Sequence, residues 1–144
     1  EKFRIRYYND RFCFITLEKK IKHNSLCMKK DAEITEAECR ALLSVDTGWM
    51  LGHSEELVRE LYCKMKSQQL RPRVLVSYKR EPYVYAAGNV RVTFDSNIRT
   101  TLFHRDFLEN QVRDIETEEV PGDMILEVKF DEFLPEIIAC LLQT

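Results

Sequence analysis

Hydrophobic and polar residues alternate along several stretches of the chain with the two-residue period of a half-buried β-strand. The N-terminal part contains two such stretches, KFRIRYY and FCFITLEKKIK, separated by the turn-forming residues NDR. In the second stretch Ile15 and Leu17 share one face, whereas Phe14 and Thr16 share the other. A short returning strand, LCMKK, is expected after the turn HNS. The pattern therefore predicts an antiparallel meander.

Two segments in the middle of the chain have the period of amphipathic helices. The first, TEAECRALLSV, begins with Thr35, and Glu38 three residues later completes a capping box. The second, SEELVRELYCKMKSQQL, has Ser54 as its expected N-cap. Its apolar stripe consists of Leu57, Leu61 and Met65. Near the C-terminus, LPEIIACLLQ predicts a third helix with Pro135 in its first turn.

Strands return between the second and third predicted helices. RPRVLVSYKREPYVY carries Arg80, and VRVTFD places Arg91 and Asp95 on one side, where Asp95 is expected to accept the Arg91 guanidinium. MILEVKFD follows the turn EVPGD and has Glu127 and Lys129 opposite its apolar side chains. The apolar face of this strand is expected to pack against outer helices, including the C-terminal one. The order of elements predicts one α+β domain over residues 1–144.

Composition narrows the class of protein. A chain of 144 residues suffices for one domain with a core, and its net charge of −2 disfavours a general nucleic-acid binder. The five cysteines form no C-x-x-C pair and are odd in number, which argues against a disulfide framework or a structural zinc site. They suggest a reducing, cytoplasmic location. No apolar run approaches the roughly 20 residues of a membrane span. We also expect a fragment of a longer protein, because the chain starts at Glu1, already inside a strand.

The polar faces of the predicted strands carry an excess of basic residues. The charged side chains on these faces are Arg4, Arg6, Glu18, Lys20, Lys22, Lys29, Arg80, Arg91, Glu127 and Lys129. One interpretation is a solvated sheet face, on which exposed pairs contribute only about 0.2–1 kcal/mol each. The other is a sheet that curls with its charged face inward, because helices can cover the apolar faces. Buried like charges would then require a ligand that compensates them.

A polyanion together with a divalent cation would compensate such a surface. Arginine offers fork-shaped donors to phosphate oxygens, and lysine offers a compact point charge. Glu127 and Glu18 are the candidate ligands for Mg²⁺ or Mn²⁺, which prefer carboxylate and phosphate oxygens. Basic side chains and a metal ion together would stabilise the charge that spreads over a transferring phosphoryl group.

Five motifs, in this order, resemble the strand motifs of VTC domains. They are KFRIRYY, LEKKIK, YKREPY, VRVTFD, and ILEVKF followed by LPEII. VTC domains are the vacuolar transporter chaperone-type polyphosphate polymerase domains of the CYTH-like triphosphate tunnel superfamily, and the turn lengths are similar to those of bacterial members. The resemblance implies a tunnel-shaped antiparallel β-barrel with helices packed outside. It also implies the partners ATP and polyphosphate, the cofactor Mn²⁺ or Mg²⁺, and the membrane-protein partner that many members have.

The resemblance assigns roles to particular residues. It implies that catalysis depends on Arg4, Arg6, Lys20, Arg80, Arg91 and Lys129. The same six, with Lys22 and Lys29, would contact phosphate, and Glu127 and Glu18 would hold the metal ion. The family has further strands before KFRIRYY and a basic segment after the last helix, which this chain lacks, and a basic residue is usual where Asp31 stands. The barrel of this fragment is therefore expected to be incomplete, and activity of the fragment itself is in doubt.

The resemblance implies transfer of the γ-phosphate of ATP to polyphosphate. Two other functions are compatible with the same residues. The first is a triphosphatase in the same tunnel, although that branch usually has an E-x-E-x-K signature and this chain has only E-x-K. The second is a non-catalytic module that binds polyphosphate, inositol phosphates or nucleotides.

Overall fold

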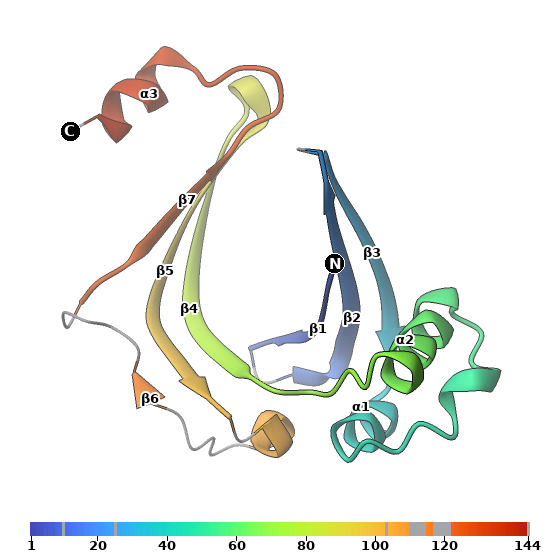
Figure 1. Cartoon of the computed structure of the whole chain (residues 1–144). Coiled ribbons are helices and arrows are strands. Elements are labelled where there is room, and N and C mark those ends of the chain that lie inside the picture. Colours follow the sequence, from blue (N-terminus) through green and yellow to red (C-terminus); the bar gives the residue numbers. More distant parts are fainter. Residues whose placement is uncertain (10, 25, 103, 110–114, 117–121, 144) are drawn as a thin grey trace. The chain divides into compact units, whose positions relative to one another are not determined.

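The computed structural model describes residues 1–144 except 10, 25, 103, 110–114, 117–121 and 144 (Figure 1). The chain forms two compact units. The first consists of residues 1–74 and 103–113, and the second consists of residues 75–102 and 114–144. The predicted turn EVPGD lies partly outside the described residues.

The first unit contains a sheet of three antiparallel strands in the order β1-β2-β3. The strands are β1 (Lys2–Tyr8), β2 (Arg11–His23) and β3 (Leu26–Ile34). The predicted meander is confirmed, with Arg4 opposite Glu18 and Lys20 opposite Lys29. β3 is longer than the stretch LCMKK because the alternation continues to Ile34, which is buried.

Two helices of the first unit follow β3 along the chain. α1 (Glu36–Leu43) starts at the predicted capping box, in which the side chain of Thr35 accepts from the backbone N–H of Glu38. α2 (Glu56–Ser67) has Glu55 as its N-cap and no capping side chain, so the prediction of Ser54 at this position is wrong. The predicted stripe of Leu57, Leu61 and Met65 is buried. The short 3₁₀ helices η1 (Met50–Gly52) and η3 (His104–Leu108) also belong to this unit.

The core of the first unit lies between one face of its sheet and the helices (Figure 1). Ile15 and Leu17 of β2 are each 1% exposed, and they pack with Cys39 of α1 and with Val58 and Leu61 of α2. The opposite face of the sheet is free to carry charge.

The second unit contains β4 (Leu75–Tyr85), β5 (Val90–Thr101), β6 (Ile115–Glu116) and β7 (Ile125–Lys129), with η2 (Ala87–Asn89) in the β4–β5 turn. β5 pairs with each of the other three strands, always antiparallel. β5 continues six residues beyond the motif VRVTFD, and its register with β4 shifts between Ser77 and Lys79. Asn97 lies opposite this irregularity with a positive φ of 51°, a conformation that asparagine tolerates.

The last helix, α3 (Glu136–Leu142), follows a segment that packs on the β4–β5 turn. Gly88 has a φ of 72°, and a Cβ atom there would lie 2.6 Å from the carbonyl oxygen of Phe133, so this contact requires glycine. α3 has no buried residue, and Leu126 of β7 is 46% exposed. The prediction that α3 covers the apolar face of β7 is therefore wrong, because the segment before it is held at the turn instead.

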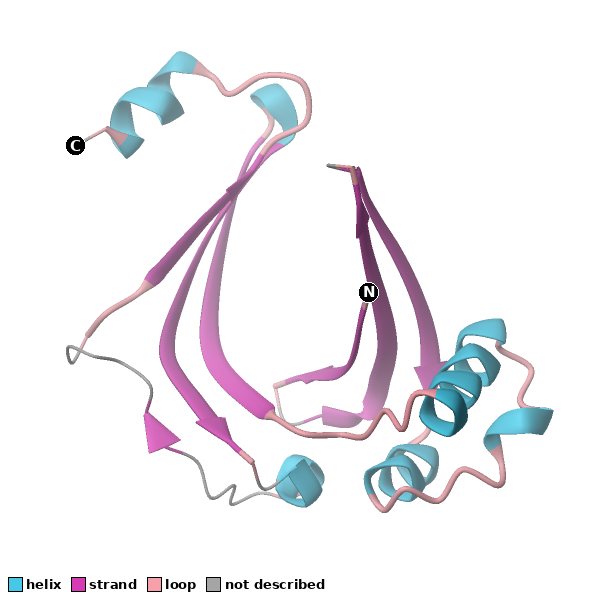
Figure 2. Ribbon diagram, in the orientation of Figure 1, coloured by secondary structure: helices cyan, strands magenta, loops and turns pink. Residues whose placement is uncertain are grey.

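The structure confirms an α+β fold with two antiparallel sheets and three α-helices in the described residues (Figure 2). The hydrogen-bonded strands of the described residues form two separate sheets, so the closed β-barrel stays a prediction, as does the single domain. Among the described helices, none has the length and apolar character that crossing a membrane requires.

Candidate phosphate-binding site

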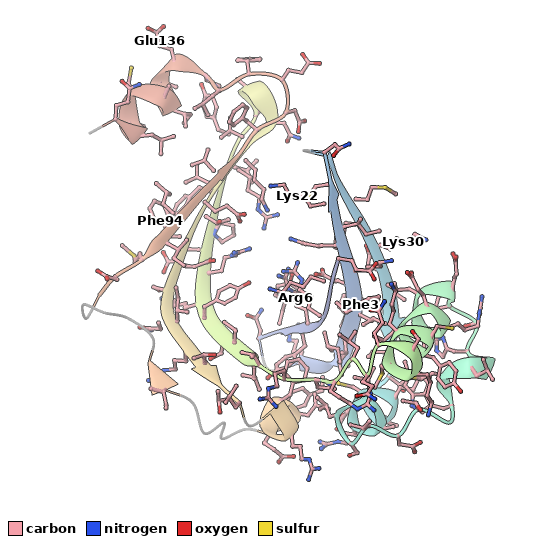
Figure 3. All side chains as sticks on the ribbon, viewed as in Figure 1. Phe3, Arg6, Lys22, Lys30, Phe94 and Glu136 are labelled. Carbon is pink, nitrogen blue, oxygen red and sulfur yellow. The ribbon has the colours of Figure 1, made fainter. Side chains whose placement is uncertain are left out.

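The sheet of the first unit has one face against α1 and α2 and one face that is rich in basic residues. The second face, called the basic face below, carries Lys2, Arg4, Arg6, Glu18, Lys20, Lys22 and Lys29. Figure 3 shows Arg6 and Lys22 on this side of the sheet, and Phe3 and Lys30 on the helix side. The structure thus brings together the six site residues that were predicted in this part of the chain.

Glu18 lies at the centre of the basic face and is 3% exposed. Its Oε1 atom lies 3.1 Å from Nζ of Lys29 and 3.9 Å from Nη1 of Arg6, and its Oε2 atom accepts a hydrogen bond from Nε of Arg4. Burial opposes ionisation, but the hydrogen bonds from Lys29 and Arg4 outweigh it, so the pKa of Glu18 is lowered. The carboxylate therefore stays ionised at neutral pH and links residues of β1 and β3.

Three lysines form a row across the basic face. Lys2 lies directly opposite Lys20, and Lys20 lies directly opposite Lys29. Like charges directly opposite each other on antiparallel strands are destabilising, because the Cβ atoms of such pairs are only about 4.5–5.5 Å apart. A bound anion would relieve this repulsion. Lys2 is not among the predicted site residues, although it shares the parity of Arg4 and Arg6.

Lys19 lies on the helix side, although it neighbours two residues of the basic face in sequence. It is 5% exposed, and its ammonium group pairs with Glu60 of α2 and lies 3.0 Å from Oε2 of Glu1. The hydrogen bond to Glu60 raises the pKa of Lys19 despite its burial. Lys19 therefore ties the sheet to α2 and is not available to a ligand on the basic face.

The sheet of the second unit also has one face that is rich in charged residues. Its charged face carries Arg80, Arg91, Thr93, Asp95, Glu127 and Lys129. Arg91 lies opposite Lys129 and Thr93 lies opposite Glu127, as the alternation of VRVTFD and ILEVKF predicts. Four predicted site residues thus share one face of this sheet, and the other six share the basic face of the first unit.

Arg80 is engaged by Asp95 through two hydrogen bonds of 2.6 Å, from Nε to Oδ1 and from Nη2 to Oδ2. The expected pair of Asp95 with Arg91 is wrong. The β4–β5 register places Arg80 opposite Asp95, whereas Arg91 lies four residues away along β5, roughly 13 Å at the usual rise of a strand. These hydrogen bonds raise the pKa of Arg80. Nη2 of Arg80 also lies 3.8 Å from Oε2 of Glu127.

Arg91 and Lys129 repeat the like-charge pairing of the first unit. They lie directly opposite each other on β5 and β7, and both are exposed. Nζ of Lys129 lies 3.3 Å from Oε1 of Glu127, which offsets part of the repulsion. The guanidinium of Arg91 is the more accessible of the two arginines predicted on this face, since Asp95 occupies one edge of Arg80.

Thr93 and Glu127 lie directly opposite each other on β5 and β7, on the charged face. Thr93 is 3% exposed, and within the described part of the chain its Oγ1 atom has no hydrogen-bond partner. The Glu127 side chain is 42% exposed, so its carboxylate is open to a ligand. This oxygen set fits Mg²⁺ or Mn²⁺. No three His, Cys, Asp or Glu side chains of the described residues lie together.

Replacement of Thr93 by valine tests whether its hydroxyl serves a ligand. Thr93→Val keeps the shape of the side chain and removes an unpaired buried hydroxyl. We expect the free energy of unfolding without ligand to rise by about 1 kcal/mol, and the Mn²⁺-dependent affinity for tripolyphosphate to fall. Urea denaturation and calorimetric titration measure the two effects. A fall in stability would show instead that the hydroxyl has a structural partner.

Comparison with known proteins agrees with the motifs. A family model described as VTC domain matches residues 1–144. The search of curated proteins and the search of solved structures found no match. The match spans both units, and therefore both the basic face and the charged face.

Proposed function

Because the chain belongs to the VTC domain family, which is related to polyphosphate polymerases, we propose that it transfers the γ-phosphoryl group of ATP to polyphosphate. In this reaction the bond between the γ-phosphorus and the β,γ-bridging oxygen breaks. A terminal oxygen of the polyphosphate chain forms the new bond to phosphorus, and ADP leaves with the bridging oxygen. The protein supplies no covalent nucleophile, so its contribution is positioning and electrostatic stabilisation.

The observation that carries this proposal is the pairing of like charges on both sheets. Lys2, Lys20 and Lys29 form one row, and Arg91 and Lys129 form another. On a sheet face that serves only solubility, we expect residues directly opposite each other on neighbouring strands to carry opposite charges, because such pairs are stabilising. Rows of one sign suit a chain of phosphates, which offers negative oxygens at regular intervals.

The residues of the two faces have different proposed roles. Arg4, Arg6, Lys20, Lys22 and Lys29 bind phosphate oxygens on the basic face. Arg91 and Lys129 bind the transferring group, for which arginine offers two parallel donors. Arg80 contributes through the nitrogen that Asp95 leaves free, Nη1. The tunnel that the family resemblance implies stays a prediction.

Glu127 is the proposed metal ligand, with Thr93 beside it. A divalent ion bound there would neutralise charge on the phosphate oxygens during transfer. Lys129, at 3.3 Å from the carboxylate, orients Glu127. The metal requirement predicts that EDTA abolishes synthesis but only weakens the binding of tripolyphosphate.

The central lysine of the row provides the test of phosphate binding. We expect tripolyphosphate to stabilise the wild-type protein, by about 2.7 kcal/mol at 100 times its Kd. Lys20→Gln should weaken binding several-fold and reduce the shift in melting temperature, because a charge at the centre of the basic face is lost. Differential scanning fluorimetry with tripolyphosphate measures the shift.

Lys30→Gln is the matched control for this experiment. Lys30 lies on the same sheet, on the helix side, and pairs only loosely with Glu56 at 3.8 Å. Lys30→Gln changes the net charge by the same amount as Lys20→Gln, but it should keep the full shift in melting temperature that tripolyphosphate causes. Equal losses in Lys20→Gln and Lys30→Gln would mean that tripolyphosphate responds to net charge alone, and the proposed site would be rejected.

A further inference from the structure

Glu18 is a poor ligand for a metal ion in this structure. Both of its oxygens already face cationic nitrogens, those of Lys29 and Arg6 at Oε1 and that of Arg4 at Oε2. A divalent cation at either oxygen would lie among positive charges, which repel it. Glu127 also has a cationic nitrogen near each oxygen, Nζ of Lys129 at 3.3 Å from Oε1 and Nη2 of Arg80 at 3.8 Å from Oε2. Its side chain, however, is 42% exposed, against 4% for the side chain of Glu18, so a metal ion can reach its carboxylate from solvent.

The contacts of Glu18 instead fix the orientation of its neighbours. Arg4 donates to Glu18 through Nε, and its contacts with the described residues leave Nη1 and Nη2 available to donate to a phosphate. Glu18 also holds Lys29 of the neighbouring strand β3, whose Nζ atom lies 3.1 Å from Oε1 of Glu18. Long basic side chains lose conformational freedom when they bind a ligand, and a buried carboxylate that restrains them beforehand reduces this cost.

We infer that Glu18 is a positioning residue that holds Arg4, Arg6 and Lys29 for phosphate binding, and that it is not a ligand of the metal ion. This inference rests on the proposed function. The inference predicts that removal of the Glu18 charge lowers the affinity for an anion, the opposite of the effect expected from charge alone. Removal of a negative charge from a basic face should strengthen anion binding by charge alone, whereas removal of a positioning carboxylate should weaken it.

The experiment is calorimetric titration of tripolyphosphate into the purified protein in EDTA, without metal. Glu18→Gln should weaken binding on the order of tenfold, because the restraint on three cations is lost. Asp31→Asn is the matched control. Asp31 lies opposite Glu18 on the same face, but it is exposed, and among the described residues it is within ion-pair distance of Lys29 alone, at 3.4 Å. Its loss should leave binding unchanged or tighten it by a few-fold.

Two results would overturn the inference. If Glu18→Gln tightens binding as Asp31→Asn does, Glu18 acts only through its charge. If Glu18→Gln leaves metal-free binding unchanged and weakens Mn²⁺ binding, measured by electron paramagnetic resonance, as much as Glu127→Gln does, Glu18 is a metal ligand. Circular dichroism verifies folding. Should the glutamine variant not fold, Glu18→Asp decides, because it keeps the charge and retracts the carboxylate. Positioning predicts weaker binding, and a role of charge alone predicts no change.

A measurement without ligand separates this inference from the proposed function. In protein labelled with ¹⁵N-arginine, the Nε–Hε signal of Arg4, assigned by its loss in Arg4→Lys, should be protected from exchange in the wild type. It should lose protection in Glu18→Gln and keep it in Asp31→Asn. A wild type that does not bind tripolyphosphate would refute the proposed function. The Arg4 signal would still show whether Glu18 holds Arg4, and an unchanged signal in Glu18→Gln would refute that.

Discussion

Glu127→Gln is expected to lower polyphosphate synthesis from ATP by about 100-fold or more, the largest functional effect of a single substitution in this chain. Glutamine keeps the size of the side chain and removes the charge that would bind Mg²⁺ or Mn²⁺. The free energy of unfolding should change by less than about 0.5 kcal/mol, because the side chain is 42% exposed. The rate of polyphosphate formation at saturating Mn²⁺ measures the effect.

Glu81→Gln is the matched control for Glu127→Gln. Glu81 belongs to the same sheet but shares the opposite face with Phe94 and Leu126, and its carboxylate pairs with Lys79 at 3.1 Å. This variant should keep its rate of synthesis. Full activity in a correctly folded Glu127→Gln protein would refute the assignment of the metal ligand.

Arg80→Ala is expected to reduce the free energy of unfolding by about 3 kcal/mol, the largest expected effect on stability. The substitution leaves Asp95, which is 8% exposed, as a buried carboxylate without its two hydrogen bonds. Asp95→Ala should cost less, about 1–2 kcal/mol, because the guanidinium that remains is 26% exposed and can be hydrated. Urea denaturation measures both values.

The double variant Arg80→Met with Asp95→Leu completes this test. Replacement of both partners by apolar residues should restore part of the stability that Arg80→Ala loses, because no unpaired charge remains. A double variant that is no more stable than Arg80→Ala would show that the two residues do not act as a pair. Activity lost in Arg80→Ala must be compared with this change in stability before a phosphate contact is assigned to Arg80.

The alternation of side chains made most of the fold and both charged faces predictable. The alternation of positions alone placed Glu18 on the same sheet face as Lys20, and Glu127 on the same face as Lys129. The register of the strands agrees. The capping box at Thr35 fixed the start of α1, because its two hydrogen bonds are local and depend on residues three positions apart. Local chemistry and strict periodicity therefore carried the successful predictions.

The failures have physical reasons that a single sequence does not reveal. Which residue faces which across a sheet depends on register, and the pairing of Asp95 with Arg80 follows from the β4–β5 register. The sequence predictions gave Lys19 no role, and it is buried on the helix side because Glu60 of a distant helix compensates its charge. The helix α3 stays off the sheet because the preceding segment packs against Gly88. Each of these facts depends on contacts between residues far apart in the chain.

The like-charge rows support phosphate binding on both faces. Lys20 lies opposite Lys2 and Lys29, and Arg91 lies opposite Lys129, while Glu18 and Glu127 offset part of the repulsion. A triphosphatase or a binding module would use the same rows, so the distinction between these functions depends on the product.

The most direct test is therefore analysis of the products that the purified protein forms from ATP and Mn²⁺. Gel electrophoresis resolves polyphosphate by chain length, and a phosphate assay and chromatography quantify free phosphate and ADP. The account predicts long-chain polyphosphate, with one ADP for each phosphate incorporated and little free phosphate. Release of free phosphate without polyphosphate would identify a hydrolase, and tight binding of ATP or polyphosphate without turnover would identify a binding module; either result would contradict the proposed synthesis.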